Sequence, residues 1–271
     1  MTQKVRHILS LSGGKDSTAL AIYLRDYRCV PDMEYIFHDT DKELPDTIEY
    51  LKLLEAYLGA PIKRTTKHTS FDKMLRVYGG MLPSNHRRWC TRMLKLKPFE
   101  EYIGDDPVIN YVGLRADEDR TGYISHKPNI KVVYPFQEDG IVYEDVIRIL
   151  EESGLGMPPY TEWGRTHSGC FFCFYQQKIE WVRLKQKYPE LYEEAKTYEK
   201  PNKINGNVFY WNQDESLEEL EQPERIAEII ANWKKTQDRL KTKRKNRPLV
   251  SVLAGYESED EEDQGCLMCF L

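Results

Sequence analysis

The sequence predicts an α/β fold in which an open parallel sheet carries helices on both faces, followed by a mostly helical C-terminal extension. Short apolar runs of strand length alternate with helical patterns from Val5 to Glu152. Because such alternation places crossover helices between the strands, the strands are expected to run parallel. The polar cluster His38-Asp39-Thr40-Asp41 follows the second strand, where parallel sheets collect ligands.

The elements follow from local patterns. Strands are expected at 5–11, 34–37, 61–65 and 108–114, and an extended segment at 131–135, because these runs are apolar and rich in β-formers. Helices are expected from about Lys15, and at 45–58, 71–78, 96–103 and 143–152, where apolar residues recur at helical spacing. Pro45 suits a first helical turn, and Gly154 suits a helix end.

The C-terminal third is predicted to be helical. Residues 178–198 have helical spacing interrupted near Pro189, and Pro223 opens an amphipathic helix that has Trp233 on its apolar side. We place the domain boundary after residue 175, so that 1–175 form the α/β domain and 176–271 the helical region. That region includes a basic helix end (241–247), an acidic tether (257–263) and a terminal CxxC. The basic end either binds nucleic-acid phosphates or is a solvated helix end whose cations complement the helix dipole.

Composition narrows the class of protein. The chain has 271 residues and a net charge of −5, which is no global signature of nucleic-acid binding. It has neither an apolar run of roughly 20 residues nor a signal peptide, so we expect a cytoplasmic protein without a membrane partner. Its six cysteines, without an export signal, favour metal or redox chemistry over disulfides.

The stretch from Leu9 to Thr18 joins a strand to a helix through Gly13 and Gly14. Glycines allow the backbone to turn sharply, and the helix that follows directs its N–H groups and positive dipole end at the same point. Lys15 adds a full charge, and Ser12 and Ser17 add hydroxyl donors. The segment is not a Walker A motif, because Asp16 follows Lys15. It is either an ordinary tight turn or, as we expect, a cradle for a pyrophosphate group.

The segment SGGKDS resembles the PP-loop of the ATP pyrophosphatase superfamily. The chain is similar to the branch that contains phosphoadenylyl-sulfate reductases and the Dnd-type and Ssp-type proteins of DNA phosphorothioation, and further segments resemble that branch in the right order: 38–47, 88–98, 112–118 and 168–173. The resemblance implies an adenine nucleotide alpha-hydrolase-like fold. It also implies that ATP is bound by Ser12, Gly13, Gly14, Lys15, Asp16, Ser17, Asp39, Lys95 and Arg115, with Lys15 and Asp16 catalytic.

If residues 13–17 hold the β and γ phosphates, the α phosphate is open to attack, which gives an adenylylated substrate and pyrophosphate. Such a reaction needs Mg²⁺, for which Asp16, Asp39 and Asp41 are suitable oxygen ligands. Alternatively, Asp39 and Asp41 only cap the next helix. Two further cations, Lys95 and Arg115, lie in segments similar to the family's anion-binding elements. Lys97 and Arg120 share those segments and are weaker candidates.

The cysteines suggest a metal site. Cys170 and Cys173 form a CxxC that Cys266 and Cys269 repeat, and two such knuckles can close a tetrahedral site for zinc or iron. Family members with clusters have two adjacent cysteines at the Cys90 position, whereas Thr91 replaces the second here. We expect Cys90, Cys170, Cys173 and Cys266 (or Cys269) to hold a [4Fe–4S] cluster. Alternatively, the cluster keeps an open iron and the tail cysteines relay sulfur, or the knuckles hold zinc and leave Cys90 as a nucleophile.

Three functions remain, in order of preference. The first is an ATP pyrophosphatase that adenylylates a nucleic-acid oxygen for sulfur insertion, with a DNA backbone phosphate favoured over a tRNA base. It requires a sulfur donor, for which a cysteine desulfurase is the natural partner. The second is a reductase of adenylyl sulfate or phosphoadenylyl sulfate that produces sulfite, although the family's tail motif is missing. The third is a non-catalytic ATP-sensing subunit. A homo-oligomer is compatible with each of them.

Overall fold

The computed structural model describes residues 4–65, 70–119, 125, 127–199, 201, 206, 208–212 and 215–245, with side chains as far as residue 240. Within these ranges the strands are β1 (Arg6–Leu11), β2 (Met33–Phe37), β3 (Ile62–Arg64), β4 (Val108–Tyr111) and β5 (Ile130–Val133). They form one sheet in the order β3-β2-β1-β4-β5, and all four neighbouring pairs are parallel. The predicted open parallel sheet is confirmed.

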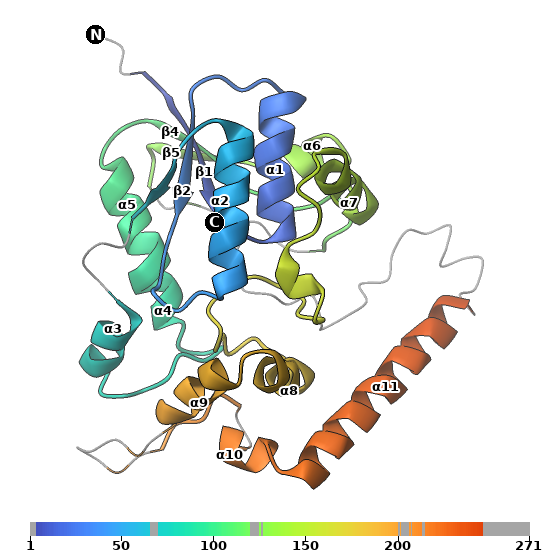
Figure 1. Ribbon diagram of the computed structural model, residues 1–271. Coiled ribbons are helices and arrows are strands. Elements are labelled where there is room, and N and C mark those ends of the chain that lie inside the picture. Colours follow the sequence, from blue (N-terminus) through green and yellow to red (C-terminus); the bar gives the residue numbers. More distant parts are fainter. Residues whose placement is uncertain are drawn as a thin grey trace.

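Helices cover both faces of this sheet (Figure 1). On one face Leu9, Phe37 and Tyr111 pack in a core with α1 (Lys15–Asp26), α2 (Pro45–Leu58) and α7 (Tyr143–Glu152). On the other face Ile8 and Ile36 pack against α5 (Lys97–Ile103). The strands alternate between the two cores because successive side chains point to opposite faces. Both faces being apolar, β1 and β2 have the nearly continuous apolar sequences of buried parallel strands.

A longer helical segment than expected precedes β4. It begins with α4 (Trp89–Thr91), continues through a π-helical turn over Arg92–Leu96, and ends in α5. The sequence predicted helix only from Leu96. Pro98 lacks an N–H and its ring crowds the preceding turn, so a widened turn before it keeps the helix continuous. The strand β4 is also shorter than predicted, since it ends at Tyr111.

The remaining helices are α3 (Phe71–Val77), α6 (Pro135–Glu138), a 3₁₀ turn at Pro159–Thr161, α8 (Lys178–Lys187), α9 (Pro189–Thr197), α10 (Leu217–Leu220) and α11 (Pro223–Lys245). The predicted break at Pro189 is confirmed between α8 and α9. In Figure 1, α8, α9 and α10 lie beyond the end of the sheet. None of the helices in the described ranges has the length and apolar character needed to cross a bilayer.

An aromatic core joins this helical part to the loops at the end of the sheet. Its fully buried members include Phe71, Phe172 and Trp181, and the rings of Phe172 and Trp211 stack at a centroid distance of 4.7 Å. The core therefore collects residues from α3 to α11, separated by more than a hundred positions in the chain. The predicted boundary after residue 175 stays a prediction.

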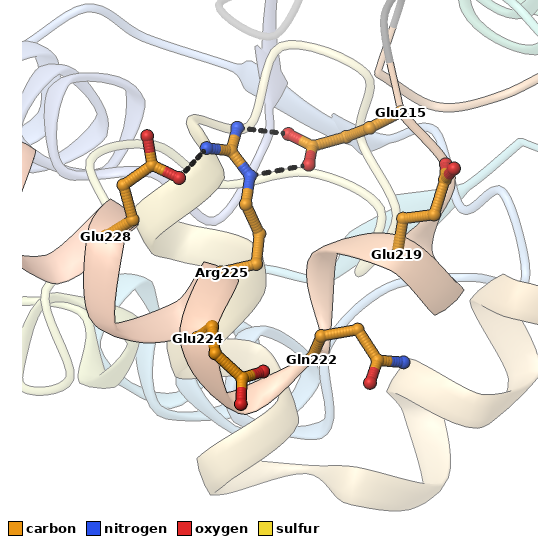
Figure 2. Close-up of a pocket in the computed structure, with 6 residues that line it drawn as sticks. All are labelled: Glu215, Glu219, Gln222, Glu224, Arg225 and Glu228. Atoms are coloured by element: carbon orange, nitrogen blue, oxygen red, sulfur yellow. Dashed lines mark hydrogen bonds and ion pairs between the residues drawn. The ribbon is translucent and has the colours of Figure 1, made fainter.

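Arg225 fixes the start of α11 (Figure 2). Its guanidinium makes two parallel hydrogen bonds to the Glu215 carboxylate, at 2.8 Å each, and a third to Glu228 at 2.6 Å. Lys178 of α8 also pairs with Glu215 at 2.5 Å. These hydrogen bonds and the cations lower the pKa of Glu215 to about 2. The pair therefore ties α11 to the segment before α10 and to α8.

We predict that Arg225→Leu lowers the free energy of unfolding by about 1 kcal/mol near pH 7. The folded-state pKa of Glu215 is depressed from 4.5 to about 2, so its stabilising contribution is complete above pH 4.5 and is lost as the pH falls toward 2. The difference between wild type and variant should therefore shrink between pH 5 and about pH 3. Urea titrations across this range measure it.

Arg148→Leu is the matched control, because Arg148 makes an exposed pair with Asp145 within one helix. It should change stability by less than about 0.5 kcal/mol at every pH. A deficit in Arg225→Leu that stays constant from pH 7 to pH 3 would contradict the assignment to this ion pair.

Candidate functional site

The glycine turn between β1 and α1 is tightly enclosed. Gly13 has φ +71°, a conformation that side chains rarely adopt, and a Cβ there would lie 2.5 Å from Thr47 Cγ2 in α2. A Cβ on Gly14 would lie 2.8 Å from Ser168 Oγ. The two positions therefore exclude any side chain. As predicted, the turn leads directly into a helix that begins at Lys15.

Three hydroxyl groups converge on the turn. Ser12 Oγ lies 3.1 Å from Ser17 Oγ and accepts a hydrogen bond from Ser168 Oγ at 3.1 Å. The Gly14 N–H also donates to Ser12 Oγ, at 3.3 Å. Because all three serines are buried, they bond to one another in place of water. Hydroxyls and N–H groups gathered at a helix N-terminus are the donors that a phosphate group requires.

At the start of α1, Asp16 forms ion pairs with two basic side chains. Its carboxylate binds Lys15 Nζ at 3.1 Å through one oxygen and Arg115 Nη1 at 2.9 Å through the other. The side chains of Asp16 and Arg115 are 1% and 6% exposed. Arg115 also pairs with Glu118 at 2.9 Å and with Asp117 at 3.0 Å. Burial opposes the charged form of Arg115, but Asp16 and then Asp117 raise its pKa. Both oxygens of Asp16 are engaged, so its first role here is to position Lys15 and Arg115.

Two tyrosines complete the site and were missed by the sequence analysis. The hydroxyl of Tyr160 accepts a hydrogen bond from the Lys15 N–H at 3.3 Å, and burial raises the pKa of Tyr160. The ring of Tyr143 lies 5.6 Å from Lys15 Nζ and 5.3 Å from Arg115 Cζ, within cation–π range. Neither residue belongs to a sequence motif, and only the folded chain brings them to the turn.

Asp39 and Asp41 follow β2 as predicted. Asp39 accepts a hydrogen bond from Arg64 at 3.1 Å and from the Asp41 N–H at 2.9 Å, and Asp41 has φ +62°. Asp39 therefore stabilises the loop before α2 while lying at the carboxyl edge of the sheet. The alternative that these residues cap α2 is not supported by the helix itself, since its N-cap is Leu44 with no side-chain hydrogen bond.

Lys95 lies close to a second buried group that contains His38, Glu43 and Cys170. Burial and the charge of Lys95 lower the pKa of His38 to about 3, so the imidazole is neutral near pH 7. Burial raises the pKa of Glu43, and Lys95 opposes this shift. The Thr40 hydroxyl donates to Glu43 at 2.8 Å and lies 3.0 Å from Cys170 Sγ. Lys95 is therefore the nearby charge that favours ionisation of Glu43 and Cys170.

Of the four predicted metal ligands, three lie in the described part of the chain. Cys170 and Cys173 are neighbours, and Cys90 and Cys170 pack against the same aromatic core. Burial, reinforced by Glu43, raises the pKa of Cys170 well above its usual value, whereas metals bind the thiolate. Among the described residues no three His, Cys, Asp or Glu side chains are grouped to hold a metal ion. These residues therefore do not form a cluster site by themselves. The side chains described end at residue 240, so the predictions for Cys266, Cys269 and the basic and acidic segments (241–247 and 257–263) lie outside them.

Buried Arg165 is a further residue that no motif indicated. It donates to the carbonyl of Cys170 at 2.7 Å, while its Nε and Nη1 atoms have no hydrogen-bond partner in the described structure. A buried guanidinium with unused donors is costly unless an anion or water completes it. The backbone N–H of Arg165 donates to the carbonyl of Tyr160 at 3.2 Å, so Arg165 lies beside the tyrosine that contacts Lys15. The glycine turn, the hydroxyls and these cations together fit a polyphosphate such as that of ATP.

Comparison with known proteins agrees with this geometry. Residues 6–133 match the model of the phosphoadenosine phosphosulfate reductase domain. An uncharacterized protein of Methanocaldococcus jannaschii is 27% identical over 202 residues, which cover 69% of this chain and 40% of that protein. The chain thus spans less than half the length of this curated relative.

Two solved structures are similar at low identity. A phosphoadenylyl-sulfate reductase from Candida auris, in a phosphate complex, has a TM-score of 0.47 and 13% identity, covering 62% of this chain and 82% of that one. The U34-tRNA thiolase NcsA from Methanococcus maripaludis, with its [4Fe-4S] cluster, has a TM-score of 0.40 and 16% identity, covering 73% and 71%. The match over residues 6–133, which include the enclosed SGGKDS turn, supports the resemblance of this part of the chain to the phosphoadenosine phosphosulfate reductase-like branch of the PP-loop superfamily.

Proposed function

We propose that this protein is an ATP pyrophosphatase that activates a nucleic-acid oxygen for replacement by sulfur. The observation that carries the proposal is the enclosed glycine turn. At Gly13 and Gly14 an added Cβ would collide with Thr47 and Ser168, so the backbone itself can approach a ligand closely, and Lys15 provides the cation. Backbone N–H groups at the start of α1 and the three serine hydroxyls are the proposed ligands of the β and γ phosphates.

With these phosphates held, an oxygen of the substrate attacks the α phosphorus. A new P–O bond forms, the bond to the β-phosphate oxygen breaks, and pyrophosphate leaves with the bonding electrons. Lys15 and Arg115 are placed to stabilise the charge on the leaving group. Mg²⁺, when bound, would offset the negative charge of the phosphates, and it usually binds protein through one or two carboxylates together with substrate phosphates. Asp39, at the carboxyl edge of the sheet, is the carboxylate we assign to it.

Sulfide then displaces AMP from the activated substrate: a bond to sulfur forms, the bond to the AMP oxygen breaks, and one oxygen is exchanged for one sulfur. Where the donor is a persulfide, its outer sulfur attacks, and a second cysteine thiol then cleaves the S–S bond and is oxidised to a disulfide with the donor cysteine. We favour a DNA backbone phosphate as the substrate, with a tRNA base as the alternative. A cysteine desulfurase would be a suitable sulfur donor. Cys90 and Cys170 pack against the aromatic core that also contains Tyr160, and Cys173 lies next to Cys170. The described residues do not bring three cysteines, histidines or carboxylates together as ligands of an iron–sulfur cluster.

The family match itself favours a second candidate. A phosphoadenylyl-sulfate reductase would bind its nucleotide at the same glycine turn and produce sulfite. The two functions differ in whether ATP is cleaved between its α and β phosphates. A subunit that senses ATP without turnover would bind ATP and cleave nothing.

The test is anaerobic incubation with Mg²⁺ and ATP labelled on the α phosphate, with and without DNA or tRNA, followed by separation of AMP, ADP and pyrophosphate. We expect AMP and pyrophosphate, increased by one of the two nucleic acids. Lys15→Ala should lower the rate by about 10²- to 10³-fold, because a charge that stabilises the leaving group is removed. Asp16→Asn should lower it too, since Lys15 and Arg115 lose their shared anchor.

The matched controls are Lys52→Ala and Asp105→Ala, which remove the same charges at exposed positions outside the site. They should retain wild-type rates. Absence of AMP under all conditions, together with binding of adenylyl sulfate or its 3′-phosphate, would replace the proposal by the reductase. ATP binding without any product would favour the sensing subunit.

A second prediction concerns the turn itself. Gly13→Ala should abolish ATP binding, because its Cβ would clash with Thr47 and disturb the turn. Gly59→Ala is the control, since Gly59 has a similar φ of +64° but no atom within 4 Å of its added Cβ. Both variants should lose about 1 kcal/mol for the backbone conformation, and only Gly13→Ala should lose nucleotide binding in calorimetric titration. Equal ATP affinity in the two variants would exclude the turn as the phosphate site.

A further inference from the structure

A pocket of about 350 Å³ lies in front of α4, away from the glycine turn. We call it the arginine pocket and define it by six of its lining residues: Tyr78, His86, Arg87, Arg88, Trp89 and Arg92. No acidic side chain is found among the described residues that line it. Three guanidinium groups and an imidazole within seven consecutive positions therefore give this pocket a strongly positive potential.

Within the described part of the chain, two of these arginines have only neutral hydrogen-bond partners. Arg87 Nη1 donates to the Met81 sulfur at 2.8 Å, and Arg92 Nη2 donates to the Tyr78 hydroxyl at 3.2 Å. Both side chains are exposed. This contrasts with Arg115, which has three carboxylate partners in the ATP site. A guanidinium that meets neutral atoms keeps its charge uncompensated and keeps donors for an anionic ligand.

The floor of the pocket is rigid. The rings of Tyr78 and Trp89 stack at a centroid distance of 5.0 Å with an interplanar angle of 13°, and the Trp89 indole N–H donates to the Met81 carbonyl at 3.0 Å. Ser84 and Arg87 exchange two backbone hydrogen bonds, at 3.0 and 3.3 Å, which close the loop that carries His86 and Arg87. Since floor and loop are fixed in advance, little ordering is required when a ligand binds.

The pocket lies next to the predicted sulfur chemistry. Trp89 and Arg92 flank Cys90 in the chain, and all three belong to the continuous helical segment before β4. The guanidinium of Arg88 lies 5.4 Å from the ring of Tyr175, two residues beyond Cys173. The pocket therefore lies on the same helical segment as Cys90, and one of its arginines contacts the loop that follows the first CxxC.

We propose that the arginine pocket binds the sugar–phosphate backbone of a nucleic-acid strand and that Arg87 and Arg92 each contact a phosphate. The proposal rests on the proposed function in that the bound strand is the substrate to be sulfurated. Exposed guanidinium groups along one wall suit the repeated charges of a polymer, and the half-buried Tyr78 offers its ring to a base. DNA and RNA share this chemistry, so the experiment has to distinguish them.

The experiment measures binding of the full-length protein to a labelled 20-nucleotide single-stranded DNA and to an RNA of the same sequence, by anisotropy at several salt concentrations. The variant is Arg87→Ala combined with Arg92→Ala. The matched control is Arg76→Ala combined with Arg148→Ala, which removes the same charge from two exposed helix positions outside the pocket. The thermal midpoint of each protein verifies folding.

Each phosphate contact on a single strand contributes about 0.7 to the slope of log K against log salt, so the pocket variant should lose about 1.4 from this slope. At 0.15 M salt this corresponds to roughly tenfold weaker binding, with the control near wild type. The polymer that loses more affinity is the ligand. Equal losses in both double variants, or equal competition by poly-glutamate of the same charge, would overturn the proposal.

The AMP assay separates this proposal from the proposed function. If the pocket variant binds and responds to nucleic acid like wild type while AMP is formed, the pocket is refuted and the pyrophosphatase stands. If no protein forms AMP but binding still depends on Arg87 and Arg92, the pocket stands and the pyrophosphatase is refuted.

Discussion

The buried ion pair between Asp16 and Arg115 is the contact on which the rest of the site depends. It joins the first turn of α1 to the segment that follows β4, 99 residues away in the chain. Gly113 permits this approach, because a Cβ there would lie 3.1 Å from the Asp16 carbonyl oxygen. Without Arg115, the buried Asp16 carboxylate would keep Lys15 as its partner, and without Asp16 the guanidinium of Arg115 would keep Asp117 and Glu118, but the link between α1 and the segment after β4 would be lost. The position of Lys15, and with it the phosphate cradle, follows from this pair.

Most of the sheet could be predicted from the sequence because its signals are local. The start of α1 at Lys15 and both ends of α2 follow from glycine, proline and apolar spacing, and the parallel order follows from the crossover helices. The helix from Trp89 to Leu96 could not be predicted in this way. Its first turns carry arginines without a clear apolar period, and what stabilises them is burial of Trp89 and Leu94 in a core built largely by residues 160–233. A tertiary contact of this kind leaves no local pattern.

The distinction between local signals and tertiary contacts also explains which residues of the candidate site could be predicted. Ser12, Gly13, Gly14 and Lys15 could be recognised because the chemistry of a phosphate cradle requires those residue types in that order. Tyr143 and Tyr160 could not, because they reach Lys15 from α7 and from the 3₁₀ turn and have no motif of their own. Arg165, which contacts Tyr160 and the Cys170 carbonyl, has no motif either. The cysteines represent an intermediate case. Their spacing predicts ligands, but the raised pKa of Cys170 is a property of its buried surroundings that spacing does not encode.

The glycine turn and the arginine pocket differ in how their positive charges are compensated. This difference matches the different ligands proposed for the two sites. At the glycine turn Lys15 and Arg115 already pair with carboxylates, so a polyphosphate has to compete with Asp16 for them. Only a ligand that also makes hydrogen bonds to the enclosed backbone would bind favourably in that competition. In the arginine pocket Arg87 and Arg92 meet a sulfur and a hydroxyl, so any accessible phosphate gains the whole interaction. The first arrangement favours selectivity for one nucleotide. The second is the arrangement expected for the proposed contact with a polymer, whose strength would depend on the salt concentration.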